Sequence, residues 1–164
     1  MSKFPTTPAT RLLRDRNITF SEHIYRYEDR GGTKVSAKEL CVDEHSVIKT
    51  LIMEDENARP VIVLMHGDFE VSTKSLARHI GCKSVSPCKP ATADKHSGYH
   101  VGGISPFGTH KAMPVYMEQS ILDLPKIYIN GGSKGFLVGI DPKDVQMILS
   151  ATIVQVSKRA TDLR

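Results

Sequence analysis

The apolar residues of this chain fall into short runs separated by turn-forming residues, a pattern that indicates strands interspersed with helices. Strands are predicted at 18–25, 47–53, 61–66, 115–118, 126–130, 136–140 and 152–156. Helices are predicted from Pro8 to just before Asn17, at 36–40, from Ser72 to Gly81, at 91–97 and after Asp141. Two of the helix starts combine a capping side chain with a following proline, Thr7-Pro8 and Asp141-Pro142.

The order of these elements predicts an α/β fold of the α+β type. Because the later strands follow one another closely, we expect a mixed, mostly antiparallel sheet with helices packed around it. The 164 residues suit one domain that spans 1–164. No apolar run approaches the roughly 18–20 residues of a membrane span, and the N-terminus lacks the apolar core of a secretory signal. The chain is therefore expected to be soluble and cytoplasmic, with no membrane partner.

Charge and cysteine content add little to this picture. The 22 Lys and Arg residues exceed the 18 Asp and Glu residues by 4, and the sequence pI is about 9.0. This mild excess suits a polyanionic partner, although an ordinary solvated surface could carry it. Cys41, Cys82 and Cys88 are three in number and form no Cys-x-x-Cys motif, so we expect free thiols rather than a disulfide framework.

Lys49 is the most informative single residue. It stands in the predicted strand 47–53, where alternation places Lys49 on one apolar face and Thr50 on the other. Burial of an ammonium group without partners lowers its pKa, so such a lysine usually stands at a pocket wall. The alternatives are an edge-strand lysine that prevents aggregation and a lysine that extends to water.

Two glycine-rich segments are candidates for ligand contact. In 102–108, adjacent glycines allow the backbone to approach a ligand, and their N–H groups could hold a carbonyl oxygen or a developing oxyanion. Turn preferences alone favour a tight structural turn equally well. The segment 130–135 fits a hairpin, and Lys134 at its tip could alternatively contact a phosphate.

Metal-dependent and triad-based chemistry is not indicated. The spacing of Cys82 and Cys88 is not that of a zinc knuckle, and Gly98 interrupts the helix that would align His96 with His100. No nucleophile elbow is predicted, because the residues 131–135 that match Gly-x-Ser-x-Gly stand in the predicted hairpin and not in a strand-to-helix turn. We therefore predict neither a metal ion nor a cofactor.

Four segments, taken together and in order, resemble the YbaK family of aminoacyl-tRNA deacylases, which is related to the editing domain of bacterial prolyl-tRNA synthetases. These segments are Thr7-Pro8-Ala9 with Leu12-Leu13, Val47-Ile48-Lys49-Thr50-Leu51, the stretch from Gly98 to Gly108, and Ile127-Tyr128-Ile129-Asn130-Gly131-Gly132. The resemblance extends from about Thr7 to Val156. It implies a barrel-like mixed sheet and the removal of wrongly attached amino acids from the 3′ end of tRNA.

The resemblance also implies functional residues. The key lysine of the family falls on Lys49, which is the candidate catalytic residue. The substrate-binding positions fall on Tyr25, Thr50, Gly102, Gly103, Ile104, Ser105, Pro106, Asn130, Gly131 and Gly132. This chain has Phe136-Leu137-Val138 where the cysteine-specific branch carries an acidic residue, and Asn130 where serine is frequent. The amino acid that is removed is therefore left open.

The function that follows is that of a trans-acting deacylase, which hydrolyses the ester of mischarged tRNA, Cys-tRNA(Pro) or another small aminoacyl-tRNA. The attacking group would come from the substrate, either a cysteinyl thiol or a water oriented by a tRNA hydroxyl. The expected partners are the aminoacyl-tRNA 3′ end and a synthetase such as prolyl-tRNA synthetase. The alternatives are a non-catalytic module that binds a tRNA end or a synthetase, and a hydrolase that uses Cys82 or Cys88.

Overall fold

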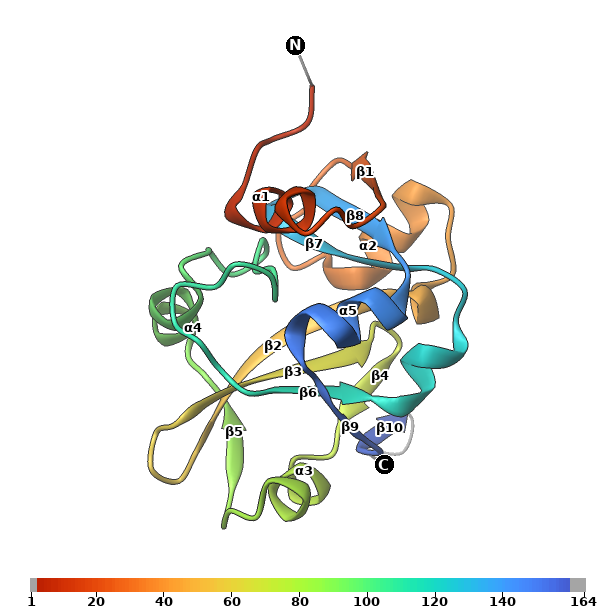
Figure 1. Ribbon diagram of the computed structural model, residues 1–164. Helices are drawn as coiled ribbons and strands as arrows, with labels where there is room; N and C mark the ends of the chain where they lie inside the picture. The colour runs from red at the N-terminus through yellow and green to blue at the C-terminus, as the bar shows by residue number, and fades with distance from the viewer. Residues whose placement is uncertain (1–2, 160–164) are drawn as a thin grey trace.

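The computed structural model describes residues 3–159, which form a large curved sheet, a small two-stranded sheet and the helices packed around them (Figure 1). The α-helices of this part of the chain are α1 (Pro8–Asp15), α2 (Gly32–Leu40), α3 (Thr73–Ile80), α4 (Pro90–Ser97) and α5 (Pro142–Leu149). Two 3₁₀ turns, η1 (Glu44–Ser46) and η2 (Gln119–Asp123), complete the helical elements. Within these residues, no helix is long and apolar enough to cross a membrane.

The main sheet has eight strands in the described residues. Its strands are β1 (Phe20–Ile24), β2 (Val47–Asp55), β3 (Pro60–His66), β5 (Val85–Pro87), β6 (Val115–Glu118), β7 (Ile127–Ser133), β8 (Phe136–Ile140) and β9 (Thr152–Val154). Their order is β1-β8-β7-β2-β3-β6-β9, and β5 pairs with β2 beside this path. Strands β4 (Phe69–Val71) and β10 (Ser157–Arg159) form a separate antiparallel pair. The pairs β2–β7, β3–β6 and β6–β9 are parallel and the others antiparallel, so the predicted mixed, mostly antiparallel α/β architecture is confirmed.

The largest core lies on the concave side of the sheet, where α1 and α5 pack. Leu13 of α1 and Val145 of α5 are fully buried there with Ile129 of β7 and Phe107 of the glycine-rich loop. A second core on the other side places α3 over β3, with Leu76 fully buried. Strand β3 is therefore covered on both faces, which explains why its sequence is a continuous apolar run.

Capping side chains set the helix starts as predicted. Thr7 accepts a hydrogen bond from the Thr10 N–H in a capping box, and Asp141 accepts one from the Lys143 N–H, each before a proline in the first turn. Ser72 caps α3, and Gly81 ends it in the left-handed conformation that glycine adopts most easily. These local signals were sufficient to place three of the helices correctly.

Several predicted boundaries are wrong. The strand predicted at 18–25 extends only over Phe20–Ile24, and the segment predicted at 152–156 ends at Val154. The helix predicted at 36–40 begins at Gly32. The predicted turn at 131–135 is confined to Lys134 and Gly135, because β7 continues to Ser133 through a bulge. The short strands β4, β5 and β10 were missed, since three residues are too few to show a period of two.

Candidate active site at the open edge of strand β2

One edge of β2 is left unpaired in the middle of the strand. Pairing with β7 is limited to Val47 and Ile48, because β7 bulges away between Asn130 and Ser133. Pairing of the same edge with β5 begins at Met53. The opposite edge pairs with β3 continuously from Ile48 to Glu54. The sheet therefore has a gap beside Lys49–Ile52, at the positions where the strand carries its two polar residues.

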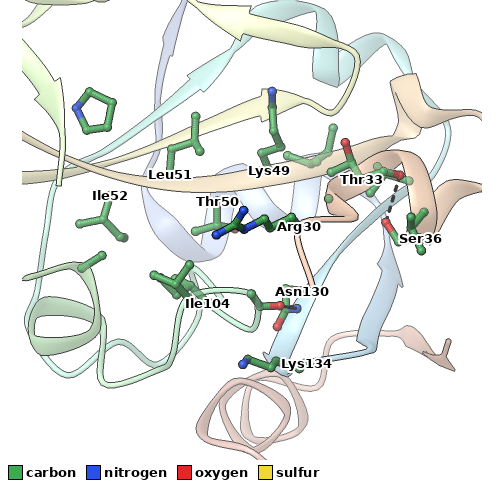
Figure 2. Close-up of a pocket in the computed structure, with 18 of the residues that line it drawn as sticks. Arg30, Thr33, Ser36, Lys49, Thr50, Leu51, Ile52, Ile104, Asn130 and Lys134 are labelled. Atoms are coloured by element: carbon green, nitrogen blue, oxygen red, sulfur yellow. Dashed lines mark hydrogen bonds between the residues drawn. The ribbon is translucent and has the colours of Figure 1, made fainter. Parts of the chain in front are cut away.

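A cavity of about 870 Å³ occupies this gap (Figure 2). Small-molecule sites commonly enclose roughly 300–1,000 Å³. Seven consecutive residues of β2, from Val47 to Met53, line it. Because neighbouring residues of a strand point to opposite faces, a cavity lined by all of them must lie against the edge of the strand. Parts of α2, α4, β4, the glycine-rich loop and the β7–β8 hairpin close it.

Lys49 lines the cavity and is half-buried. The Nζ atom donates a hydrogen bond to the backbone carbonyl of Phe69. Burial lowers the pKa of Lys49, and the carboxylates of Glu70, Glu44 and Asp68 oppose that shift. Figure 2 shows Lys49 projecting from one face of β2, while Thr50, Ile104 and Asn130 lie on the other side of the strand. The lysine and the glycine-rich loop thus border the same cavity from different faces of β2.

Thr50 lines the cavity and carries an unpartnered polar atom. Its Oγ1 is buried and has no hydrogen-bond partner in the described residues. A buried hydroxyl without a partner is costly and is typical of a position that a ligand or a water satisfies. The side chain projects toward the side of the cavity where Ile104 and Asn130 lie (Figure 2). Thr50 is therefore a stronger candidate for substrate contact than its sequence position alone indicated.

The two glycines of the predicted oxyanion loop have different surroundings. Gly102 lines the cavity with a φ of 97°, and a Cβ there would lie 2.5 Å from the Tyr27 hydroxyl. Its N–H makes no hydrogen bond within residues 3–159. The Gly103 N–H instead donates to the His100 carbonyl at 2.8 Å, and Gly103 packs against the backbone of Ser133 and Lys134. Of the two N–H groups, Gly102 offers the free one.

The three other predicted binding residues of the glycine-rich loop are one lining residue and two buried ones. Ile104 lines the cavity. Ser105 is fully buried, and its Oγ accepts a hydrogen bond from the Phe107 N–H at 3.2 Å. Pro106 is also buried and does not line the cavity. Ser105 and Pro106 therefore fix the shape of the loop that presents Gly102 and Ile104.

The segment 130–132 supports the wall of the cavity through internal hydrogen bonds and close packing. Asn130 lines the cavity, but its amide nitrogen donates to the Ser133 carbonyl at 3.2 Å and to the Gly102 carbonyl at 3.4 Å. Its Oδ1 accepts from the Gly132 N–H at 2.6 Å. A Cβ on Gly131 would lie 2.5 Å from the Phe136 ring, so glycine here permits close packing. The asparagine therefore links the β7 bulge to the glycine-rich loop.

Tyr25 lines the cavity as the resemblance implied, and burial raises the pKa of its hydroxyl. Two cations of the lining, Arg30 and Lys134, were not among the predicted binding residues. Both are exposed, and the Lys134 Nζ lies 5.4 Å from the centre of the Tyr27 ring. Arg30 adopts a φ of 62°, which is unusual for a residue other than glycine. A single sequence does not reveal that backbone conformation, so Arg30 could not be predicted. Lys134 was already a candidate phosphate contact at the tip of the predicted hairpin.

Cys88 lines the cavity and lies beside Glu54 and His96, which do not line it. Their potential ligand atoms lie within 4.8 Å of one another, and His96 Nε2 is 3.1 Å from Glu54 Oε2. Burial and the Glu54 carboxylate raise the pKa of the Cys88 thiol to about 11, and burial also raises that of Cys82. Because the thiolate is the nucleophile, a thiol held protonated argues against a cysteine-dependent hydrolase.

Comparison with known proteins places this geometry in context. The family model of the aminoacyl-tRNA editing domain matches residues 29–148, which include the whole of β2, the glycine-rich loop and the β7–β8 hairpin. The chain belongs to the aminoacyl-tRNA editing domain family. The cavity at the edge of β2 thus lies within the matched region of an editing domain.

Individual relatives extend this finding. EbsC of Enterococcus faecalis, named as a candidate Cys-tRNA(Pro)/Cys-tRNA(Cys) deacylase, is 23% identical over 93% of this chain and 94% of its own length. Proline–tRNA ligase of Limosilactobacillus fermentum is 23% identical over 62% of this chain, which corresponds to 18% of that enzyme. A crystal structure of a candidate trans-editing enzyme for prolyl-tRNA synthetase superposes with a TM-score of 0.79 at 18% identity, covering 94% of this chain and 99% of that one. The editing-domain fold is therefore shared at full length.

Proposed function

We propose that this chain is a trans-acting deacylase that hydrolyses the ester bond of mischarged tRNA. The observation that carries the proposal is the cavity at the open edge of β2, in a chain of the editing-domain family. The cavity combines an apolar part around Ile52 and Ile104 with charged side chains of both signs: the cations Lys49, Arg30 and Lys134 and the acids Glu28, Asp29 and Glu70. An apolar pocket beside cations suits an amino-acid side chain joined to an RNA terminus.

The cations would bind the RNA terminus. Arg30 and Lys134 are exposed at the cavity, where they can meet phosphates from solvent. Lys49 is half-buried and already hydrogen-bonded to the protein, so its amine is held in a defined place. We assign it to orienting the terminal adenosine and the ester through charge-assisted hydrogen bonds, which makes it the catalytic residue of the proposal.

The chemistry requires little from the protein besides positioning. A water molecule adds to the ester carbonyl carbon, the bond from that carbon to the ribose oxygen breaks, and the ribose oxygen takes up a proton. The free N–H of Gly102 would stabilise the negative charge that develops on the carbonyl oxygen. A tRNA hydroxyl would orient the water; with a cysteinyl ester, the substrate thiol could attack instead and leave as a thiolactone.

Substrate choice would follow from the size of the apolar part of the cavity. A difference of one methylene gives only about 10–200-fold selectivity in a hydrophobic pocket. We therefore expect turnover of several small esters, those of cysteine, alanine and serine. The likeness to prolyl-tRNA synthetases and to a trans-editing protein supports tRNA(Pro) as the carrier and a synthetase as the partner, with the cytoplasm as the place of action.

The proposal is tested by incubating the protein with cysteinyl-, alanyl-, seryl- and prolyl-tRNA(Pro) and measuring the released amino acid. The wild-type protein should hydrolyse at least one of the small esters well above the spontaneous rate. Lys49→Ala should lower that rate about 100-fold or more, the usual scale for one electrostatic group in a catalytic site. Lys49→Arg should also be impaired, because the guanidinium is larger and planar.

Lys143→Ala is the matched control, since Lys143 is an exposed lysine of α5 that does not line the cavity. It should retain wild-type turnover. Tight binding of the tRNAs with no release of amino acid would instead support the non-catalytic module. Full turnover by a folded Lys49→Ala protein would remove the lysine from the mechanism.

A further inference from the structure

The open edge of β2 has room for a single residue. In a strand, the N–H and C=O of alternate residues point to the same edge. The Val47 carbonyl accepts from the Gly67 N–H on the β3 side, and the Ile52 carbonyl accepts from the Cys88 N–H on the other side. The backbone groups of Ile48, Thr50 and Ile52 therefore point to the edge that β7 and β5 share. Ile48 pairs with β7 and Ile52 is held by Cys88, so Thr50 alone stands between them.

We propose that Thr50 binds the substrate through its backbone, as one strand of a sheet binds another, and that the site accepts only esters of a single amino acid with a free α-amino group. This inference rests on the proposed function and adds the class of acyl group to it. The Thr50 N–H and C=O face the cavity without a ladder partner in the described residues. Both are therefore available to a ligand.

An aminoacyl group has the complementary pair of groups. Its ester carbonyl can accept from the Thr50 N–H, and its α-ammonium can donate to the Thr50 carbonyl, which reproduces a hydrogen-bonded pair of an antiparallel sheet. The bond to the ester carbonyl would add to the stabilisation by Gly102. The bond from the ammonium is charge-assisted and hence stronger than one between neutral groups. Its formation anchors the amino acid by its main chain, whatever its side chain is.

The hydroxyl of Thr50 supports the same assignment by an independent observation. The Oγ1 atom is buried and has no partner within residues 3–159. It stands on the residue whose main-chain groups face the gap, so an ammonium bound to the carbonyl has a second acceptor close by. One residue thus presents three polar atoms that only a ligand or water can satisfy.

An acyl group on the α-nitrogen would prevent this arrangement in two ways. It removes the positive charge, and it adds a second residue along an edge that is already filled. The added group would have to continue toward Ile52, whose carbonyl already accepts from the N–H of Cys88, the residue after β5. The site should therefore reject N-acetylaminoacyl and dipeptidyl esters, although these also join the acyl group to the ribose by an ester bond.

The test compares one ester in two forms. The aminoacyl-tRNA that the wild-type protein hydrolyses fastest is acetylated on its α-amino group, and the rates of both forms are divided by their spontaneous rates, because acetylation also changes the intrinsic reactivity. We expect the acetylated form to be hydrolysed at least fivefold more slowly on this scale. A smaller difference overturns the inference and leaves the deacylase function intact; no hydrolysis of any free aminoacyl-tRNA overturns the function itself.

A pair of variants locates the discrimination. Thr50→Val keeps the shape of the side chain and removes the hydroxyl, whereas Thr50→Ser keeps the hydroxyl. Thr50→Val should lose at least half of the measured preference for the free α-amino form, and Thr50→Ser should retain it. If a folded Thr50→Val protein keeps the full preference, the Thr50 hydroxyl does not contact the amino group, and the assignment of a second acceptor to it is wrong.

Discussion

Strands β2 and β3 are neighbours in one sheet and illustrate two uses of an apolar strand. Val61 to His66 of β3 are all buried, and β3 pairs with β2 on one side and with β6 on the other. The middle of β2, from Lys49 to Leu51, is only half-buried, and one of its edges is open to the cavity. Two polar residues in an otherwise apolar strand thus coincide with the place where the sheet is left unpaired.

This difference between β2 and β3 separates residues that contribute to stability from residues that contribute to chemistry. In β3 every backbone group and side chain can be satisfied inside the protein. In β2 the same kind of strand leaves a lysine partly desolvated and a threonine hydroxyl without a partner. Each feature costs free energy in the empty protein, and the surrounding cores must offset that cost. Substitutions in β3 should therefore affect stability, and substitutions in the middle of β2 should affect activity.

The largest effect is expected in β3. Leu64 is fully buried between the helices and the sheet, so Leu64→Ala should lower the free energy of unfolding by about 2–5 kcal/mol. Leu51→Ala, at a half-buried position of β2, should lower it by clearly less. Urea denaturation of both variants measures the difference. Equal losses would contradict the proposed division between the two strands.

Next in size is the cost of overpacking at Gly131, in the bulge of β7 beside Phe136 of β8. Gly131 is buried, and a Cβ there would lie 2.5 Å from the Phe136 ring. Gly131→Ala should therefore lower the free energy of unfolding by roughly 1–3 kcal/mol, the usual cost of overpacking. Thermal unfolding checks this value. A variant as stable as the wild type would show that the glycine is not there for packing.

A smaller change in the free energy of unfolding, in the opposite direction, is expected for Thr50→Val. Its hydroxyl is buried and unpartnered, so Thr50→Val should leave the free energy of unfolding unchanged or raise it by up to about 1 kcal/mol. The same variant should lose about tenfold in deacylation rate. Urea denaturation and the deacylation assay on one preparation test both statements. A destabilised Thr50→Val protein would mean that the hydroxyl has a partner in the folded state.

The smallest effect is the dependence of the free energy of unfolding on pH, and it is expected from His66 at the end of β3. Burial lowers the pKa of His66 below its ordinary value of 6.5, against the opposing fields of Asp68 and Glu118. Between 6.5 and the lower folded value, the unfolded chain binds more protons than the folded one, so the free energy of unfolding falls as the pH falls through this window. Burial lowers the pKa of His23 in the same sense.

The expected change between pH 7.5 and pH 5.5 is about 1 kcal/mol or less for one histidine. Measurement of the free energy of unfolding at both pH values provides the check. His66→Asn should show a shallower dependence on pH than the wild type, whatever its stability at pH 7.5. An unchanged dependence would mean that His66 titrates alike in both states.

Much of the fold could be predicted from local signals, whereas the site could be predicted only in part. The periods of β2, β3 and β8 and the caps at Thr7, Ser72 and Asp141 are properties of short segments. Lys49 was found because a charge in an apolar strand is visible in sequence. The open edge beside Thr50 depends on where β7 and β5 end, and so on residues about 35 to 80 positions away.

The glycine segments show the same limit. For 102–108 the adjacent glycines allowed either a close approach of the backbone to a ligand or a tight turn, and for 130–135 they fitted a hairpin. Sequence could not tell whether the approach is to a ligand, as the free N–H of Gly102 allows, or to another part of the protein, as Gly131 shows against Phe136. That distinction depends on tertiary contacts between separate strands and loops.

The most direct test of ligand binding at the open edge uses an unreactive analogue. The adenosine 3′-amide of the amino acid released fastest is added to ¹⁵N-labelled protein, and backbone amide shifts are followed by NMR. The largest shifts should occur at Thr50 and Gly102, and the amides of Val63 to Met65 in β3 should change little. Saturable binding with the largest shifts outside the cavity, or no shifts at Thr50 and Gly102, would contradict the placement of the substrate at the edge of β2.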